Sequence, residues 1–234
     1  MLHTRIFKFN PLETNCTVAW REGSRTCMVA DPGMFYRECT NQLVDFLKEH
    51  GLVPDAVLLT HGHFDHTWGV KQLLEHFPGV PVYMNPLDKE ILDAGPSLME
   101  GRGKVASQRS DFPFVPVSEG LVVDSGCASW KAIATPGHTP GGVCWWCESD
   151  NLLLSGDTLF AGSIGRTDLQ GGDYDALMKS LLEKVMLLPG ETDVIPGHGQ
   201  PTSIAREAQS NPFLVPYNEP DGPWWEQEGI PIQG

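Results

Sequence analysis

The amino-acid sequence predicts an α/β protein in which strands outnumber helices. Two observations carry this prediction. Short apolar runs of the kind found in strands are separated by Gly and Pro turns, and a few segments between them show the spacing of amphipathic helices. The predicted strands come in clusters along the chain.

The predicted elements follow one another with short gaps. The strand-like runs lie at residues 6–9, 17–20, 27–30, 56–59, 80–84, 121–123, 129–134, 142–147, 152–154 and 192–195. Apolar residues at helical spacing lie at residues 43–47, with Gly51 as a stop, and at residues 70–77 and 177–185. We interpret residues 95–111 as a long surface loop. The pattern predicts one domain over residues 1–210 and a tail rich in Pro, Gly and Trp over residues 211–234, without a separate fold.

Composition narrows the classes of function. The 234 residues include 16 Lys and Arg against 30 Asp and Glu, which gives a net charge of −14. This balance weighs against nucleic-acid binding and against a polybasic membrane anchor, because both need clustered positive charge. The sequence has no apolar run long enough for a signal peptide or a membrane helix, so we expect a soluble, cytoplasmic protein.

Six scattered cysteines then indicate reduced thiols. Cys144 and Cys147 form a C-x-x-C pair, but we expect them to be ordinary strand residues. In an extended strand, residues three apart face opposite sides, which separates the two sulfurs.

The most informative stretch directly follows the predicted strand at residues 56–59. It contains His61, His63, Asp65 and His66 in the pattern H-x-H-x-D-H. In an extended turn His61 and His63 project the same way and can share one metal. Asp65 and His66, entering the next helix, then point to a second position nearby.

Three further segments repeat the order of strand, turn and ligand-type residue. They end in His138, Asp157 and His198. Ligands gather beyond the carboxyl ends of strands in sheets flanked by helices, so we expect all four segments to converge on one site.

Seven ligand-type residues are too many for one tetrahedral zinc. They suit two metals, about 3.5–4 Å apart and bridged by a carboxylate and a hydroxide. We assign His61, His63 and His138 to the first metal and Asp65, His66 and His198 to the second, with Asp157 bridging them. Zinc is the expected divalent ion, with iron or manganese as alternatives, and a single-metal site also remains open.

The motifs THGHFDH, TPGHTPGG, SGDTLF and PGHG together resemble the motif set of the metallo-β-lactamase superfamily. Within it, LFAGSIGRTD and PGHGQPTSIAREAQSNPFL resemble the short bacterial branch of type II glyoxalases, the hydroxyacylglutathione hydrolase-like proteins. The likeness runs from about Asn15 to about Leu214. It implies a four-layer αββα sandwich of two mixed β-sheets, with the metals at one edge and the same division of ligands. It also implies that Asp31 belongs to the shell behind the ligands.

The sequence departs from the family pattern in the part that would bind the substrate. Full-length type II glyoxalases carry a C-terminal helical domain with basic residues for glutathione, and the sequence after His198 is too short for it. Arg166 falls where the family has a basic residue facing the glutathione carboxylates, which predicts a substrate-binding role. We expect Asp168 to orient Arg166 or its loop.

The resemblance implies a metal-dependent thioester hydrolase with Asp65 and Asp157 at its catalytic centre. A metal-bridging hydroxide would attack the carbonyl of an S-acylglutathione-type substrate, since metal coordination lowers the pKa of water from 15.7 to about 7. Two other classes remain open: a mononuclear iron persulfide dioxygenase and a non-catalytic metal-binding protein. The expected partner is a small molecule rather than nucleic acid or membrane, and the sequence leaves the oligomeric state open.

Overall fold

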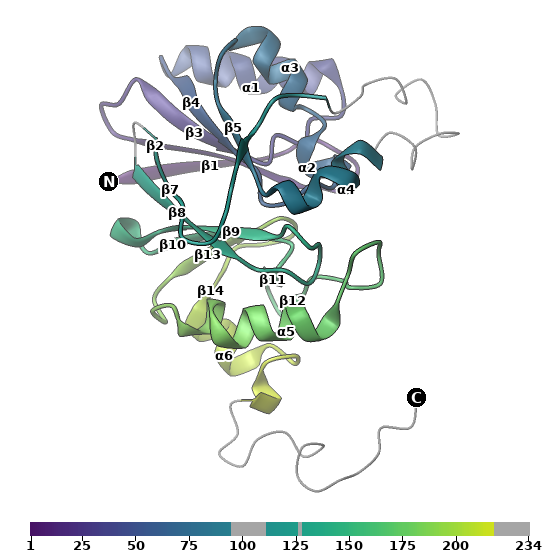
Figure 1. Cartoon of the computed structure of the whole chain (residues 1–234). Coiled ribbons are helices and arrows are strands. Elements are labelled where there is room, and N and C mark those ends of the chain that lie inside the picture. Colours follow the sequence, from purple (N-terminus) through teal and green to yellow (C-terminus); the bar gives the residue numbers. More distant parts are fainter. Residues whose placement is uncertain (95–110, 126–127, 218–234) are drawn as a thin grey trace, which may run out of the picture.

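Two six-stranded β-sheets pack face to face, and helices cover the outer side of each (Figure 1). The computed structural model describes residues 1–94, 111–125 and 128–217. This arrangement confirms the predicted four-layer αββα sandwich. The predicted surface loop lies outside the described residues except for Asp111, as does the predicted tail beyond residue 217. The domain boundary at residue 210 stays a prediction.

The first sheet is built from the amino-terminal part of the chain. Its order is β1-β2-β3-β4-β5-β6. The first three strands are antiparallel, and β3 to β6 are parallel. The strands are β1 (Leu2–Lys8), β2 (Asn15–Arg21), β3 (Thr26–Ala30), β4 (Val53–Leu58), β5 (Val82–Met84) and β6 (Val115–Pro116). The helices of this part are α1 (Arg37–Glu49), α2 (Phe64–Thr67), α3 (Val70–His76), the 3₁₀ turn η1 (Pro86–Asp88) and α4 (Lys89–Ala94).

The second sheet has the order β14-β13-β10-β9-β8-β7, in which only the β10 and β13 pair is parallel. Its strands are β7 (Val122–Ser125), β8 (Ala128–Ala134), β9 (Val143–Cys147), β10 (Leu152–Gly156), β13 (Asp193–Pro196) and β14 (Thr202–Ser203). A small ladder joins β11 (Leu159–Phe160) to β12 (Ser163–Ile164). The helices are α5 (Tyr174–Glu183), α6 (Ile204–Ser210) and the 3₁₀ turns η3 (Glu148–Asp150), η4 (Val185–Leu187) and η5 (Val215–Tyr217).

Side chains alternate between layers along each central strand, as the two-residue period of a strand requires. In β9, Cys144 packs with the α5 layer, whereas Trp145 and Cys147 pack in the core between the sheets. The two cysteines of the C-x-x-C pair therefore belong to different layers, as predicted. The five cysteines within the described residues form no disulfide with one another.

Long elements were predictable and very short ones were not. Each predicted strand and each of the three predicted helices has a counterpart in the structure. The strands β6, β11, β12 and β14 were missed because each has only two residues, too few to show a period. The short helices α4 and α6 were missed as well.

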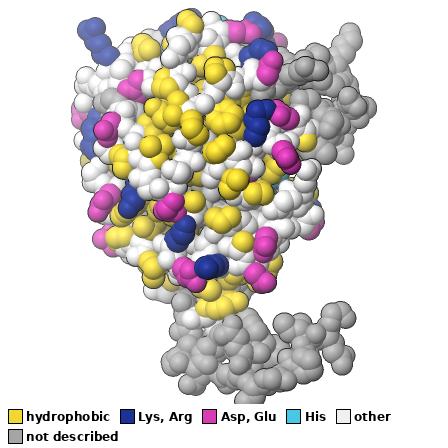
Figure 2. All heavy atoms as spheres, viewed as in Figure 1, with side chains coloured by type: hydrophobic (Ala, Val, Ile, Leu, Met, Phe, Trp, Pro, Cys, Tyr) yellow, Lys and Arg dark blue, Asp and Glu magenta, His cyan; other side chains and the backbone are white. Residues whose placement is uncertain are grey.

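The distribution of charged side chains on the surface agrees with the acidic composition. On the face shown in Figure 2, Lys and Arg side chains lie singly among acidic and apolar ones. Among the described residues, none of the helices has the length and apolar character needed to traverse a lipid bilayer.

The contact between the sheets depends on Trp145, whose indole Nε1 donates a hydrogen bond to the Leu59 carbonyl oxygen at 3.0 Å. Replacing Trp145 by Phe removes this donor from a fully buried site and leaves a small cavity. We expect the free energy of unfolding to fall by about 2–4 kcal/mol, measured by urea denaturation. The control is Trp146→Phe, because that neighbouring ring is only half-buried on the opposite side of the strand. Equal losses in the two variants would contradict this account.

Candidate metal centre

The predicted ligands gather at one edge of the sandwich because four strands end there. In the second sheet β8, β10 and β13 run in the same direction, since β9 lies antiparallel between β8 and β10. Their carboxyl ends deliver His138, Asp157 and His198. The first sheet delivers His61 just after β4, and the hydrogen bond from the Val143 amide to the Thr60 carbonyl oxygen (2.8 Å) joins the two edges.

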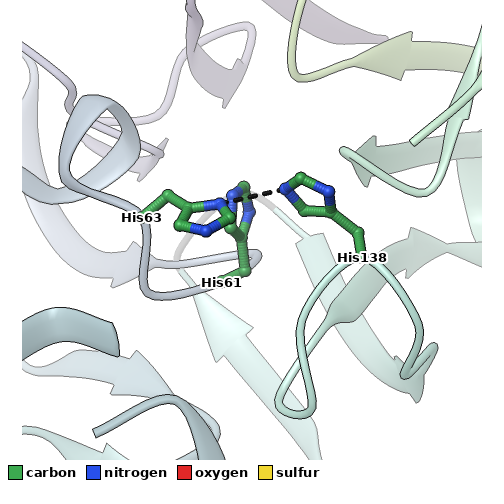
Figure 3. A group of neighbouring side chains, drawn as sticks. All are labelled: His61, His63 and His138. Carbon is green, nitrogen blue, oxygen red and sulfur yellow. Dashed lines mark hydrogen bonds between the residues drawn. The ribbon is translucent and has the colours of Figure 1, made fainter. Parts of the chain in front are cut away.

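The first group of side chains consists of His61, His63 and His138. Their ring nitrogens lie close enough together to hold one metal ion. Figure 3 shows the rings pointing toward one another, with His138 approaching from the other sheet. His63 Nδ1 lies 3.0 Å from His138 Nε2.

The second group consists of Asp65, His66 and His198, which also meet the geometry for one ion. His66 Nε2 lies 3.3 Å from His198 Nε2, and His198 Nε2 lies 3.3 Å from Asp65 Oδ2. The helix α2 begins between His63 and Asp65, so its first turn brings Asp65 and His66 together, and the His66 ring lies beside that of His61 with 4.1 Å between ring centroids. The sequence predicted both groups, and their service as ligands stays a prediction.

Asp157 lies between the two groups. One carboxylate oxygen is 3.4 Å from His66 Nε2 in the second group, and the other is 3.4 Å from His138 Nε2 in the first group. The carboxylate therefore has the position that a bridging ligand would need.

Hydrogen bonds behind the rings fix which nitrogen faces the centre. His138 Nδ1 lies 2.7 Å from the Arg166 carbonyl oxygen, and His198 Nδ1 lies 2.9 Å from the Leu12 carbonyl oxygen. Because a carbonyl only accepts, each Nδ1 must carry the proton. Each Nε2 then presents its lone pair to the metal position.

Asp31 supports the centre from behind, as the resemblance implied. Its Oδ2 accepts hydrogen bonds from the Thr60 hydroxyl (2.7 Å) and from His66 Nδ1 (2.9 Å). The Thr60 hydroxyl also lies 3.0 Å from His61 Nδ1. One buried carboxylate thus orients a ring in each group.

The histidines of the cluster differ in the direction in which their surroundings shift their pKa values. Burial, reinforced by the neighbouring histidines, lowers the pKa of His61 well below its ordinary value. Burial and His138 lower the pKa of His63 to about 3. Burial also disfavours the charged form of His66, but the carboxylates of Asp65, Asp157 and Asp31 outweigh it and raise its pKa to about 10. The second group therefore sits in the more negative part of the site.

Two buried atoms test whether the residues fit a metal. His61 Nε2 and Asp157 Oδ1 are both enclosed and have no hydrogen-bond partner. Buried polar atoms are normally paired, and both of these point into the cluster where the other ligand atoms converge. Nitrogen and oxygen donors of this kind suit zinc, iron or manganese. The donor set therefore fits two divalent ions.

The cluster opens onto a cleft of about 710 Å³. Five of the predicted ligands line it: His63, Asp65, His138, Asp157 and His198. Its walls are mostly apolar and include Leu12, Phe64, Ile91, Phe160 and Leu169.

Arg166 also lines this cleft, and its guanidinium makes two hydrogen bonds of 2.7 Å to the Asp168 carboxylate. Asp168 thus orients Arg166, one of the two roles expected for it. The contact of Arg166 with a substrate stays a prediction.

Sequence reasoning missed the polar residues that support the second group. Asn10 Nδ2 donates to the Asp65 carbonyl oxygen (3.0 Å), and the Thr14 hydroxyl donates to Asp65 Oδ2 (2.9 Å). Both lie between β1 and β2, far from Asp65 in sequence. A turn containing Asn and Pro gave a signal for a turn and none for this contact.

The fold and the paired His and Asp groups define a metal-dependent hydrolase, and the chain belongs to the metallo-β-lactamase superfamily. The pattern of that superfamily, described as "Metallo-beta-lactamase superfamily", matches residues 9–198. This span contains all seven predicted ligands.

Individual relatives agree with this assignment. The chain is 32% identical over 216 residues to the hydroxyacylglutathione hydrolase GloC of Haemophilus influenzae, covering 91% of this chain and 98% of that protein. It is similar to the BLEG-1 B3 metallo-beta-lactamase, with 34% identity and a TM-score of 0.80 over 91% of this chain and 100% of that one. It is also similar to TTHA1623 in a di-iron-bound form, with 35% identity and a TM-score of 0.79 over 90% and 100% of the two chains.

Asp157 provides a direct test of the centre. Replacing Asp157 by Ala removes a carboxylate that contacts both groups, so we expect loss of bound metal and a fall in turnover of more than about 100-fold. Elemental analysis of the purified variant, together with a hydrolysis assay, measures both quantities. The matched control is His76→Ala, because His76 is exposed on α3 and lies outside the cluster. Full metal content with full turnover in the Asp157 variant would contradict the assignment.

Proposed function

We propose that this chain is a glyoxalase II-like thioesterase that hydrolyses an S-acylglutathione-type substrate. The observation that carries the proposal is the Asp157 carboxylate, which lies between two ligand groups at the bottom of an open cleft. The similarity to the hydroxyacylglutathione hydrolase of Haemophilus influenzae supports the choice of substrate. The similarity to a B3 metallo-beta-lactamase is comparable, which makes a direct substrate test necessary.

The chemistry requires few groups beyond the ligands. When bound, two divalent ions would supply a water molecule acidic enough to attack a carbonyl at neutral pH and a Lewis acid for the oxygen of that carbonyl. Hydrolysis breaks the carbon–sulfur bond, and a thiolate whose conjugate acid has a pKa of roughly 8.5–9 leaves without a strong general acid. The histidines of the centre are therefore free to serve as ligands rather than as proton donors.

The walls of the cleft match the two ends of such a substrate. Phe64 and Phe160 supply apolar surface near the ligands, where an acyl group would lie. Arg166 is exposed at the cleft and keeps a positive charge beside its Asp168 partner. A carboxylate of the thiol carrier could share this guanidinium.

The two other classes left open by the sequence fit less well. A non-catalytic metal-binding protein would be expected to close its site, whereas this one opens onto a cleft. A mononuclear iron persulfide dioxygenase needs one metal position, whereas the described side chains form three overlapping groups that span two positions, with the Asp157 carboxylate between them. The di-iron form of the relative TTHA1623 also supports a paired centre.

The deciding experiment combines metal counting with substrate assays on purified protein. We expect two divalent ions per chain. We also expect hydrolysis of S-lactoylglutathione, which is measured as the loss of the thioester absorbance. Nitrocefin serves as the β-lactam comparison, and we expect much slower turnover. One iron per chain, with oxygen uptake on glutathione persulfide, would overturn the proposal.

Arg166 tests the glutathione part of the proposal. Replacing Arg166 by Ala should raise KM for S-lactoylglutathione about 10-fold and leave kcat nearly unchanged, because a remote contact stabilises the bound substrate and transition state alike. Steady-state kinetics measure both constants. The matched control is Arg206→Ala, an exposed arginine on α6 in the outer helix layer. Unchanged KM in the Arg166 variant would count against glutathione as the carrier.

A further inference from the structure

A buried carboxylate that is not a predicted ligand lies behind the first group. Asp88 ends η1, the 3₁₀ turn that follows β5, and its side chain is fully enclosed. Because β5 runs parallel to β4, its carboxyl end reaches the same edge of the sheet as the turn that carries His61. Sequence reasoning did not single out Asp88, because it belongs to none of the motifs.

Asp88 joins the two loops that carry the first group. Its Oδ2 accepts hydrogen bonds from the Gly62 amide (2.8 Å) and the Thr139 hydroxyl (2.8 Å), and its Oδ1 accepts one from the Gly141 amide (2.6 Å). Gly62 stands between His61 and His63, and Thr139 directly follows His138. One carboxylate therefore spans two loops, which come from different sheets and carry all three ring ligands of that group (Figure 3).

Gly62 and Gly141 lie so close to Asp88 that a larger residue would not fit at either position. Neither Gly62 nor Gly141 has a positive φ, so their backbone conformation would accept other residues. A Cβ atom at Gly62 would lie 2.7 Å from the Asp88 carbonyl oxygen, and one at Gly141 would lie 2.6 Å from Asp88 Oδ1. Only residues without a side chain let both amides approach this carboxylate.

The second group is supported by a different residue. Asn10 Nδ2 donates to the Asp65 carbonyl oxygen, and Asn10 Oδ1 accepts from the Leu12 amide at 3.0 Å. The Leu12 carbonyl oxygen in turn lies 2.9 Å from His198 Nδ1. The hydrogen bonds of Asp88 thus reach the first group, and those of Asn10 reach the second.

We propose that Asp88 is a positioning residue for the first metal position and leaves the second position unaffected. It acts by holding the loop of His61 and His63 against the loop of His138, so that three ring nitrogens face one point. The inference rests on the metal centre of the proposed function and not on the identity of the thioester. Zinc binding without substrate tests it, so a wrong substrate leaves this test intact.

The experiment measures the zinc affinity of Asp88→Asn in two backgrounds that each keep one metal position. The asparagine preserves shape but sets its NH₂ group against at least one backbone N–H. In the His198→Ala background, which keeps the first position, we expect zinc affinity to fall roughly 10–100-fold. In the His63→Ala background, which keeps the second position, we expect a change below about 2-fold. Competition against a chromogenic chelator, with zinc alone as the probe, gives both affinities.

Two further variants make the result decisive. Asn10→Ala should give the reverse pattern, with the larger loss in the His63→Ala background. Thr139→Val removes one hydrogen bond from Asp88 and should lower the zinc affinity of the first position by about 2–10-fold. This variant tests the proposal if the Asp88 variant does not fold. Circular dichroism establishes folding in each case. Equal losses in both backgrounds, or none in either, would overturn the proposal.

Discussion

The metal centre depends on hydrogen bonds made on the side of each ring that faces away from the metal. Nitrogen lone pairs within about 3 Å of one another repel unless a cation or proton lies between them. His63 and His138 are held in such a contact. The carbonyl of Arg166 fixes His138 from behind, and the side chain of the same residue lines the cleft. The loop of Arg166, which orients the predicted ligand His138, therefore also places the predicted substrate contact.

The sandwich is what makes these hydrogen bonds possible. Asp31 reaches His66 from the end of β3, and the Trp145 indole ties β9 to the residue just after β4. Because the Trp145 contact joins the two sheets close to the site, the packing of the core sets the alignment of the ligand loops. The net charge of −14 is spread over the surface, whereas the donors at the centre are suited to two cations.

The candidate ligands and the longer strands could be predicted from the sequence. Turns of Gly and Pro do not require imidazoles, so the histidines that follow apolar strands, His61, His138 and His198, could be identified singly. Asp157 could then be grouped with them because it ends a segment of the same order. Long strands could be predicted because each shows several periods of alternation, which the two-residue strands β11 and β12 do not.

The residues that support the ligands could not be predicted in the same way. Asn10 and Asp88 act through backbone groups of residues far away in the sequence, and that pairing exists only once the sheets are packed. An Asp in a turn that begins with Pro, as Asp88 is, has an ordinary local explanation, which hides its role. Asp31 was found only through the resemblance, because the DPG turn would account for it equally well.

The division of ligands along the chain has a consequence for how the protein is made. Residues 61–66 supply four of the seven ligand-type side chains, and residues 138–198 supply the other three. During synthesis the first four leave the ribosome well before β13, so each metal position lacks a histidine until the second sheet has formed. An ion captured early would be held by an incomplete set, whereas the complete set would link the two halves of the chain through the metal. Metal supply would then bear on the last stage of assembly as well as on chemistry.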